Sequence, residues 1–206
     1  MKLIKKVYNY LKNIPTRRKN FNRIKTIEKN TRYLKSKKES DINRWENSKE
    51  LFEDWNERTS ILGNYVTPGA RIIEFGSGNM SLKVELPEKC IYTPSDIVKR
   101  NEETIICDLN EPISLELSVY DTAVFSGVLE YVYDVDTVFK QLEKHITYII
   151  LSYACSDVCN HNRLVNGWLS EFTENQLLDI FAKYNYRVID KKEWRQQTIF
   201  NLCKKG

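Results

Sequence analysis

The chain has 206 residues, of which 41% are hydrophobic, so it can bury one core but is short for a two-domain enzyme. Its longest apolar run, around residues 148–151, is far shorter than the roughly 20 residues that cross a bilayer. The five cysteines are scattered and lysines interrupt the first residues, so we expect a reduced, cytoplasmic protein without a signal peptide.

The net charge of +4 hides a strong asymmetry along the chain. Residues 1–50 hold 16 of the 32 Lys and Arg but only 5 of the 28 Asp and Glu, so their net charge is +11 and that of the remainder is −7. This difference predicts a boundary between two parts of opposite electrostatic character. We place it at residue 40, between a basic helical extension over 1–40 and an α/β domain over 41–206.

Three helical patterns occupy the basic part. In the first, apolar residues recur at helical spacing from Leu3 to Ile14 among lysines, which predicts a basic amphipathic helix that ends at Pro15. The second pattern covers residues 21–34 and the third covers residues 42–55.

These helices have more than one interpretation. They could cover a core or a homodimer partner, or attach the protein to an anionic surface, either phospholipid headgroups or nucleic acid phosphates. A short helix with one aliphatic face suits a membrane interface better than a nucleic acid groove. The favoured attachment is therefore residues 1–15 against the inner membrane face, with the protein peripheral to it.

From Ala70 onward, short apolar runs alternate with helical or loop segments, as in a sheet covered on both faces. Seven strands are predicted, at residues 71–75, 90–93, 104–107, 122–125, 147–153, 186–189 and 198–203.

The first strand runs into the turn Glu74-Phe75-Gly76-Ser77-Gly78. The two glycines allow a sharp turn and the close approach of a ligand. A dinucleotide fingerprint would require Gly or Ala where Ser81 stands, and Glu74 suits a positively charged ligand group better than a pyrophosphate. The turn therefore predicts a nucleotide-type ligand other than a nicotinamide cofactor.

Acidic residues close the next two strands. Asp96 follows the first glycine by 20 residues, where its carboxylate can accept hydrogen bonds from both hydroxyls of a ribose, and Asp108 closes the third strand. Because ligands of open parallel sheets bind outside the carboxyl ends of the strands, these residues predict one binding crevice.

At this point the chain resembles the class I S-adenosylmethionine-dependent methyltransferases, over about residues 50–206. The resemblance is carried by an ordered series of segments: residues 74–78, Asp96, Asp108-Leu109, residues 120–132, and residues 168–178, where Thr173 and Gln176 form a capping box. It implies a Rossmann-like seven-stranded sheet with helices on both faces, S-adenosylmethionine as cofactor, and methyl transfer as activity.

The resemblance also implies a cofactor-binding set. In it, Glu74 lies near the methionine amino group, Gly76 and Gly78 leave room for the methionyl and ribose portions, Asp96 binds the ribose hydroxyls, Asp108 and the Leu109 amide hold the adenine, and Ser126 lines the floor, with Ser77 and Ile97 beside them. Two positions depart from the family pattern, since Met80 stands where a third glycine is frequent and Tyr131 where histidine is frequent.

The acceptor is expected above the fourth and fifth strands, near Tyr131 and the loop that contains His161. These two are the candidate catalytic residues, and the ordinary pKa of histidine suits a base near neutrality. A base is required only if the acceptor is a hydroxyl or a protonated nitrogen. Cys155, Cys159 and His161 lack the paired spacing and the fourth ligand of structural zinc, so no metal is expected.

Three functions follow as hypotheses. The first is O-methylation of a small molecule or of a surface-glycan acceptor, such as a lipid-linked sugar of polysaccharide biosynthesis. The second is an RNA methyltransferase that uses the basic segment, although no Asn-Pro-Pro-Tyr motif follows the fourth strand. The third is a non-catalytic module that retains the fold.

Overall fold

The computed structural model describes residues 14–206, which form a seven-stranded sheet in the order β3-β2-β1-β4-β5-β7-β6. The strands are β1 Arg71–Phe75, β2 Ile91–Asp96, β3 Ile105–Ile106, β4 Thr122–Ser126, β5 Tyr148–Tyr153, β6 Tyr186–Trp194 and β7 Gln197–Lys204. Five strands are parallel, whereas β7 runs antiparallel to both β5 and β6. The seven predicted strands are confirmed.

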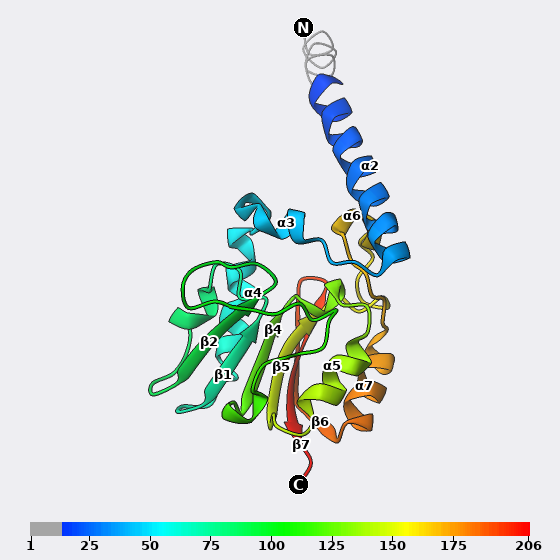
Figure 1. Ribbon diagram of the computed structural model, residues 1–206. Helices are drawn as coiled ribbons and strands as arrows, with labels where there is room; N and C mark the ends of the chain where they lie inside the picture. The colour runs from blue at the N-terminus through cyan, green and yellow to red at the C-terminus, as the bar shows by residue number, and fades with distance from the viewer. Residues whose placement is uncertain (1–13) are drawn as a thin grey trace, which may run out of the picture.

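Alternate side chains of the central strands enter two different cores. Helices cover both faces of the sheet (Figure 1). On one face, α5 Val135–Leu142 and α7 Glu174–Lys183 pack against side chains such as Ile73 and Phe125. On the other, α4 Asn56–Gly63 packs Leu62 against Ile72 and Val124. Burial on both faces explains why these strands are continuous apolar runs. The capping box of Thr173 and Gln176 at the start of α7 is confirmed.

The basic segment forms one long helix, α2 Ile14–Lys37, which projects from the sheet domain (Figure 1). Its last turns pack through Thr31 and Leu34 near the short helix α6 Arg163–Asn166, whereas Phe21 and Ile24 are exposed. The second helical pattern is therefore confirmed. The first pattern lies outside the described residues except for Ile14. Pro15 lies in the first turn of α2, where a proline lacks only an N–H that would be unpaired anyway, so the end of the first pattern at this residue stays a prediction.

The single helix predicted over residues 42–55 is also wrong. The segment is divided into α3 Ile42–Glu46 and two short 3-10 turns, η1 Ser48–Glu50 and η2 Glu53–Trp55, before α4 begins. Asn47 breaks the helix because its backbone is extended and its side chain accepts the Lys49 N–H. The remaining 3-10 turns are η3 Ser81–Val84, η4 Leu117–Val119 and η5 Leu129–Tyr131.

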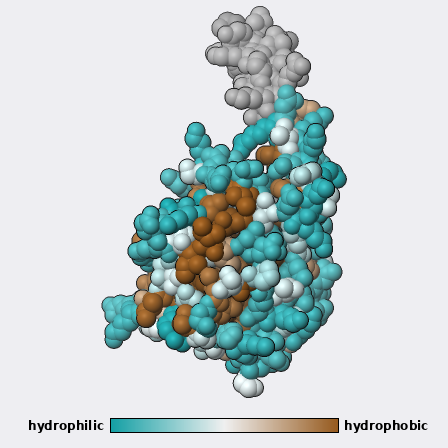
Figure 2. Space-filling view, viewed as in Figure 1, coloured by the Kyte–Doolittle hydropathy of each residue, from teal (hydrophilic) through white to brown (hydrophobic). Residues whose placement is uncertain are grey.

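The surface of α2 is largely hydrophilic, whereas apolar residues gather in a band across the domain (Figure 2). Nine Lys or Arg and one Glu lie in its sequence. Within residues 14–206, no helix combines the length and the apolar character that crossing a membrane requires.

Candidate cofactor site

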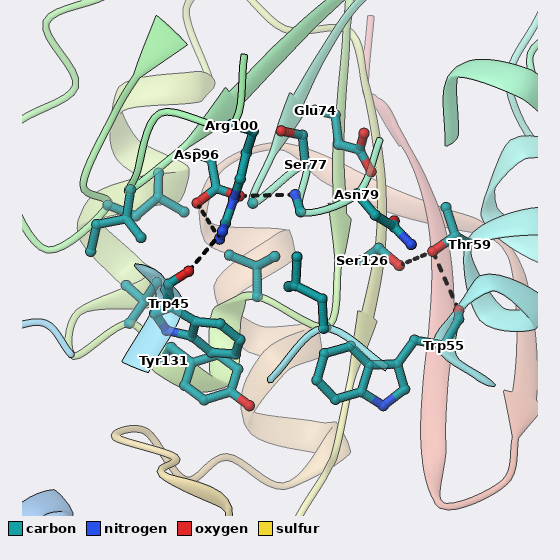
Figure 3. A pocket seen from close by; sticks show the side chains of 18 of the residues that line it. Trp45, Trp55, Thr59, Glu74, Ser77, Asn79, Asp96, Arg100, Ser126 and Tyr131 are labelled. Atoms are coloured by element: carbon teal, nitrogen blue, oxygen red, sulfur yellow. Dashed lines mark hydrogen bonds and ion pairs between the residues drawn. The ribbon is translucent and has the colours of Figure 1, made fainter. Parts of the chain in front are cut away.

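A cavity opens at the carboxyl ends of β1, β2 and β4, on the side covered by the segment that precedes β1 (Figure 3). About 1010 Å³ of empty space, which includes open solvent at the mouth, lies between the residues that line it. The sheet edge supplies every residue of the predicted cofactor set to its wall: Glu74, Gly76, Ser77, Gly78, Asp96, Ile97, Asp108, Leu109 and Ser126.

The turn after β1 requires glycine for two reasons. Gly76 has φ +69°, and a Cβ there would lie 2.5 Å from Cγ2 of Val128. Met80 is also left-handed, with φ 57°, which explains why a glycine would suit this position. The hydroxyl of Ser77 is buried and has no hydrogen-bond partner among the described side chains, so it remains available to a ligand.

Asp96 is 4% exposed and accepts four hydrogen bonds. Its Oδ2 accepts the Gly78 N–H at 2.9 Å and Arg100 Nε at 3.1 Å, and its Oδ1 accepts the Val98 N–H and Arg100 Nη2, both at 3.2 Å. Arg100 also donates through Nη1 to the carbonyl oxygen of Trp45 at 2.7 Å. The Arg100 guanidinium thus joins the end of β2 to α3 (Figure 3).

Asp108 is joined to the start of the same segment. Its Oδ1 accepts the Ser40 hydroxyl at 2.9 Å and the Asn110 N–H at 2.9 Å. Asn110 donates in turn to Ser40 Oγ at 2.7 Å and to the carbonyl of Tyr131 at 3.1 Å. Asp96, through Arg100, and Asp108 therefore also anchor the segment that precedes β1 over the cavity.

Glu74 is buried and accepts the Tyr92 hydroxyl at 2.5 Å. Burial raises the pKa of Glu74 to about 8, although the Tyr92 hydrogen bond opposes the shift. Its carboxyl therefore carries a proton at neutral pH, and a cation placed beside it would favour the ionised form.

Arg58 on α4 is a site residue that sequence reasoning missed, because it is one of many charged residues in the chain. It lines the cavity and is 5% exposed, and it donates to Ser126 Oγ at 3.2 Å, the Ser126 carbonyl at 2.9 Å and Gln197 Oε1 at 3.0 Å. Burial lowers the pKa of this guanidinium. Among the described side chains no carboxylate lies within ion-pair distance of it. A buried guanidinium without a paired carboxylate favours an anionic ligand group beside it.

The remaining wall of the cavity is aromatic. Trp45 and Tyr131 meet edge to face with their ring centroids 4.8 Å apart, and Phe52 and Trp55 form a second such pair at 4.9 Å. Burial raises the pKa of the Tyr131 phenol, so its hydroxyl stays protonated near neutrality and can donate a hydrogen bond.

His161, the other candidate catalytic residue, is exposed in the loop between β5 and α6 and does not line the cavity. The structure therefore does not bring it together with Tyr131. Over the described part of the chain, no group of three or more His, Cys, Asp or Glu side chains is placed to hold a metal ion.

No protein-family model matches the sequence, and no curated protein matches it. Solved structures do match in fold. The 1,6-didemethyltoxoflavin-N1-methyltransferase of Burkholderia thailandensis, with 1,6-didemethyltoxoflavin and S-adenosylhomocysteine bound, is 16% identical, with a TM-score of 0.62 over 84% of this chain and 88% of that one.

Two O-methyltransferases are also similar. The mitomycin 7-O-methyltransferase MmcR is 14% identical, with a TM-score of 0.60 over 85% of this chain and 60% of that one. The O-methyltransferase NcsB1, in complex with S-adenosylmethionine and 2-hydroxy-5-methyl naphthoic acid, is 13% identical, with a TM-score of 0.51 over 70% of this chain and 50% of that one. With the sheet order, these likenesses show that the chain has the class I S-adenosylmethionine-dependent methyltransferase fold.

Proposed function

We propose that the protein is an S-adenosylmethionine-dependent methyltransferase that acts on a small-molecule acceptor. The observation that carries the proposal is that the nine residues of the predicted cofactor set line one cavity, at the sheet edge where parallel α/β folds bind their ligands. The similar structures with bound S-adenosylmethionine or S-adenosylhomocysteine support the choice of cofactor.

The two ends of the cofactor would meet chemically different walls. Asp96 would take the ribose hydroxyls, and Asp108 with the Leu109 amide would take the adenine. At the other end, Glu74 would face the methionine ammonium and Arg58 its carboxylate, which gives the buried guanidinium an anionic partner.

When bound, the cofactor would supply an electrophilic methyl group. The protein then has to align the acceptor in line with that methyl and exclude water. The aromatic pairs Trp45–Tyr131 and Phe52–Trp55 form the wall suited to both tasks, and the Tyr131 hydroxyl can orient an acceptor by donating a hydrogen bond.

We propose that the acceptor atom is the oxygen of a hydroxyl group on a small molecule. The alternative acceptor is a hydroxyl group of a glycan, such as a lipid-linked sugar of a surface polysaccharide. Two of the similar structures are O-methyltransferases, which supports the hydroxyl. The basic extension, including α2, is proposed to hold the enzyme peripherally on the anionic cytoplasmic face of the inner membrane.

The test is calorimetric titration of the full chain with S-adenosylmethionine and S-adenosylhomocysteine. Wild type should bind both ligands, and Asp96→Ala should weaken binding by about 1–3 kcal/mol because hydroxyl groups lose their acceptor. His161→Ala serves as the matched control and should bind like wild type, since this residue lies outside the cavity. Absence of binding by the folded wild type would refute the proposal.

A further inference from the structure

We propose that Arg100 is a displaceable occupant of the ribose position on Asp96, so that cofactor binding releases Trp45 and rearranges the acceptor side of the cavity. The inference rests on the proposed function and adds to it a coupling between two parts of the site.

The hydrogen-bonding capacity of Asp96 is the first step of the argument. An ionised carboxylate offers about four acceptor positions, and all four are used here, two by backbone N–H groups and two by Arg100. The N–H groups of Gly78 and Val98 are fixed by the turn after β1 and by the end of β2. A ribose that donates two hydroxyls to Asp96 must therefore displace the Arg100 guanidinium.

The position of Arg100 allows such a displacement. The residue lies in the loop of residues 97–104 between β2 and β3, where no helix or strand holds its backbone. Its side chain is 11% exposed and forms an ion pair with Asp96 alone among the described carboxylates. Loss of this pair is costly for a buried cation, which lowers the net affinity of the site for a ribose.

Displacement also removes the donor that Arg100 gives to the Trp45 carbonyl at 2.7 Å. This carbonyl lies in the last turn of α3, where helical carbonyls lack partners within the helix. The ring centroids of Trp45 and Tyr131 are 4.8 Å apart, so a movement of α3 changes the aromatic wall directly. Cofactor binding would thus set the shape that the acceptor meets.

The first experiment compares Arg100→Met with Lys99→Met by calorimetric titration of the full chain with S-adenosylhomocysteine. Lys99 is the neighbouring exposed cation, and its ion pair is with Glu102 outside the cavity. We expect Arg100→Met to bind at least tenfold more tightly than wild type and Lys99→Met to bind like wild type. Equal or weaker binding by Arg100→Met would overturn the inference, because Arg100 would then serve to hold Asp96 in place.

Amide hydrogen exchange provides a second readout that a purely structural role of Arg100 would not change. On addition of S-adenosylhomocysteine, amides of residues 41–47 should exchange faster in wild type, and in Arg100→Met they should exchange fast with or without ligand. Unchanged or slower exchange in wild type would contradict the coupling. If neither wild type nor Arg100→Met binds the ligand, the proposed function fails and this inference with it, whereas weaker binding by Arg100→Met alone refutes only the coupling.

Discussion

At the scale of single residues, the buried proton on Glu74 makes stability depend on pH. The pKa of this carboxyl is about 8 in the folded protein, above its ordinary value of 4.5, so between these pH values the folded state holds a proton that the unfolded state has lost. The free energy of unfolding should therefore fall as pH rises through this window, by at most about 1.4 kcal/mol per pH unit from this group.

Urea denaturation of wild type and Glu74→Gln at pH 5 and pH 8 measures this contribution. The variant cannot titrate at this position, so its stability should fall less between the two pH values than that of wild type. Parallel changes in the two proteins would show that Glu74 is not protonated in the folded state.

The proposed contact of Arg58 with the methionine carboxylate can be tested with ligands that have or lack this group. Replacement by Met removes the buried guanidinium that faces the proposed carboxylate, and charged hydrogen bonds of this kind contribute about 1.5–3 kcal/mol. S-adenosylhomocysteine should bind roughly 10- to 150-fold more weakly to Arg58→Met. Methylthioadenosine, which has no carboxylate, should bind with unchanged affinity.

Thermal unfolding is the control here, since Arg58 also bonds Ser126 and Gln197. Arg58→Lys keeps the charge and should recover part of the affinity for S-adenosylhomocysteine. An equal loss for both ligands in a folded variant would mean that Arg58 supports the cavity wall without contacting a carboxylate.

At the scale of elements, the turn between β1 and η3 contains backbone strain at Met80. The left-handed conformation costs a non-glycine residue about 1–2 kcal/mol, and the Met80 side chain offers in return a contact with Asn101, whose Nδ2 lies 3.4 Å from its Sδ. Met80→Gly should therefore be more stable than Met80→Ala by about 1 kcal/mol, as measured by urea denaturation. The reverse order would mean that the turn relaxes away from the left-handed region.

The elements also show which parts of the fold periodicity could predict. The central strands were predictable because burial on both faces requires continuous apolar runs, and the edge strand β6 was predicted only to Ile189 because its second half, Asp190–Glu193, is polar and exposed. The segment over residues 42–55 looked helical because apolar residues recur along it, at Ile42, Trp45, Leu51, Phe52 and Trp55. In the structure Trp45, Leu51 and Trp55 line a cavity, and no local sequence pattern records its shape.

The site was predictable to the same degree. The glycines and acids that follow strands lie at one edge because the strands are parallel, so their order in the sequence was informative. Arg58, Trp45 and Ser40 reach that edge from a preceding segment through tertiary contacts, and no spacing rule connects them to it.

At the scale of the whole molecule, charge is segregated between a projecting basic helix and an acidic sheet domain. Each basic residue near an anionic membrane contributes about 1 kcal/mol, so the double variant Lys25→Gln, Lys29→Gln should bind phosphatidylserine vesicles roughly 30-fold more weakly in sedimentation assays. Lys144→Gln with Lys192→Gln on the sheet domain is the matched control.

The same assay separates the attachments. The protein should not co-sediment with neutral vesicles, and added salt should release it from anionic vesicles. If the full chain ignores anionic vesicles but binds RNA with a steep salt dependence, the membrane proposal is wrong and the basic extension serves nucleic acid.

The division of the cavity between two parts of the chain has a consequence for how its specificity can evolve. The groups proposed to hold the cofactor follow strands, whereas most of the aromatic wall comes from residues 45–55, which lie outside the sheet and contribute no fully buried side chain. Substitutions in this segment can therefore alter which acceptor fits while the sheet and its cofactor contacts persist. Such substitutions would change the acceptor while the sheet domain stays folded.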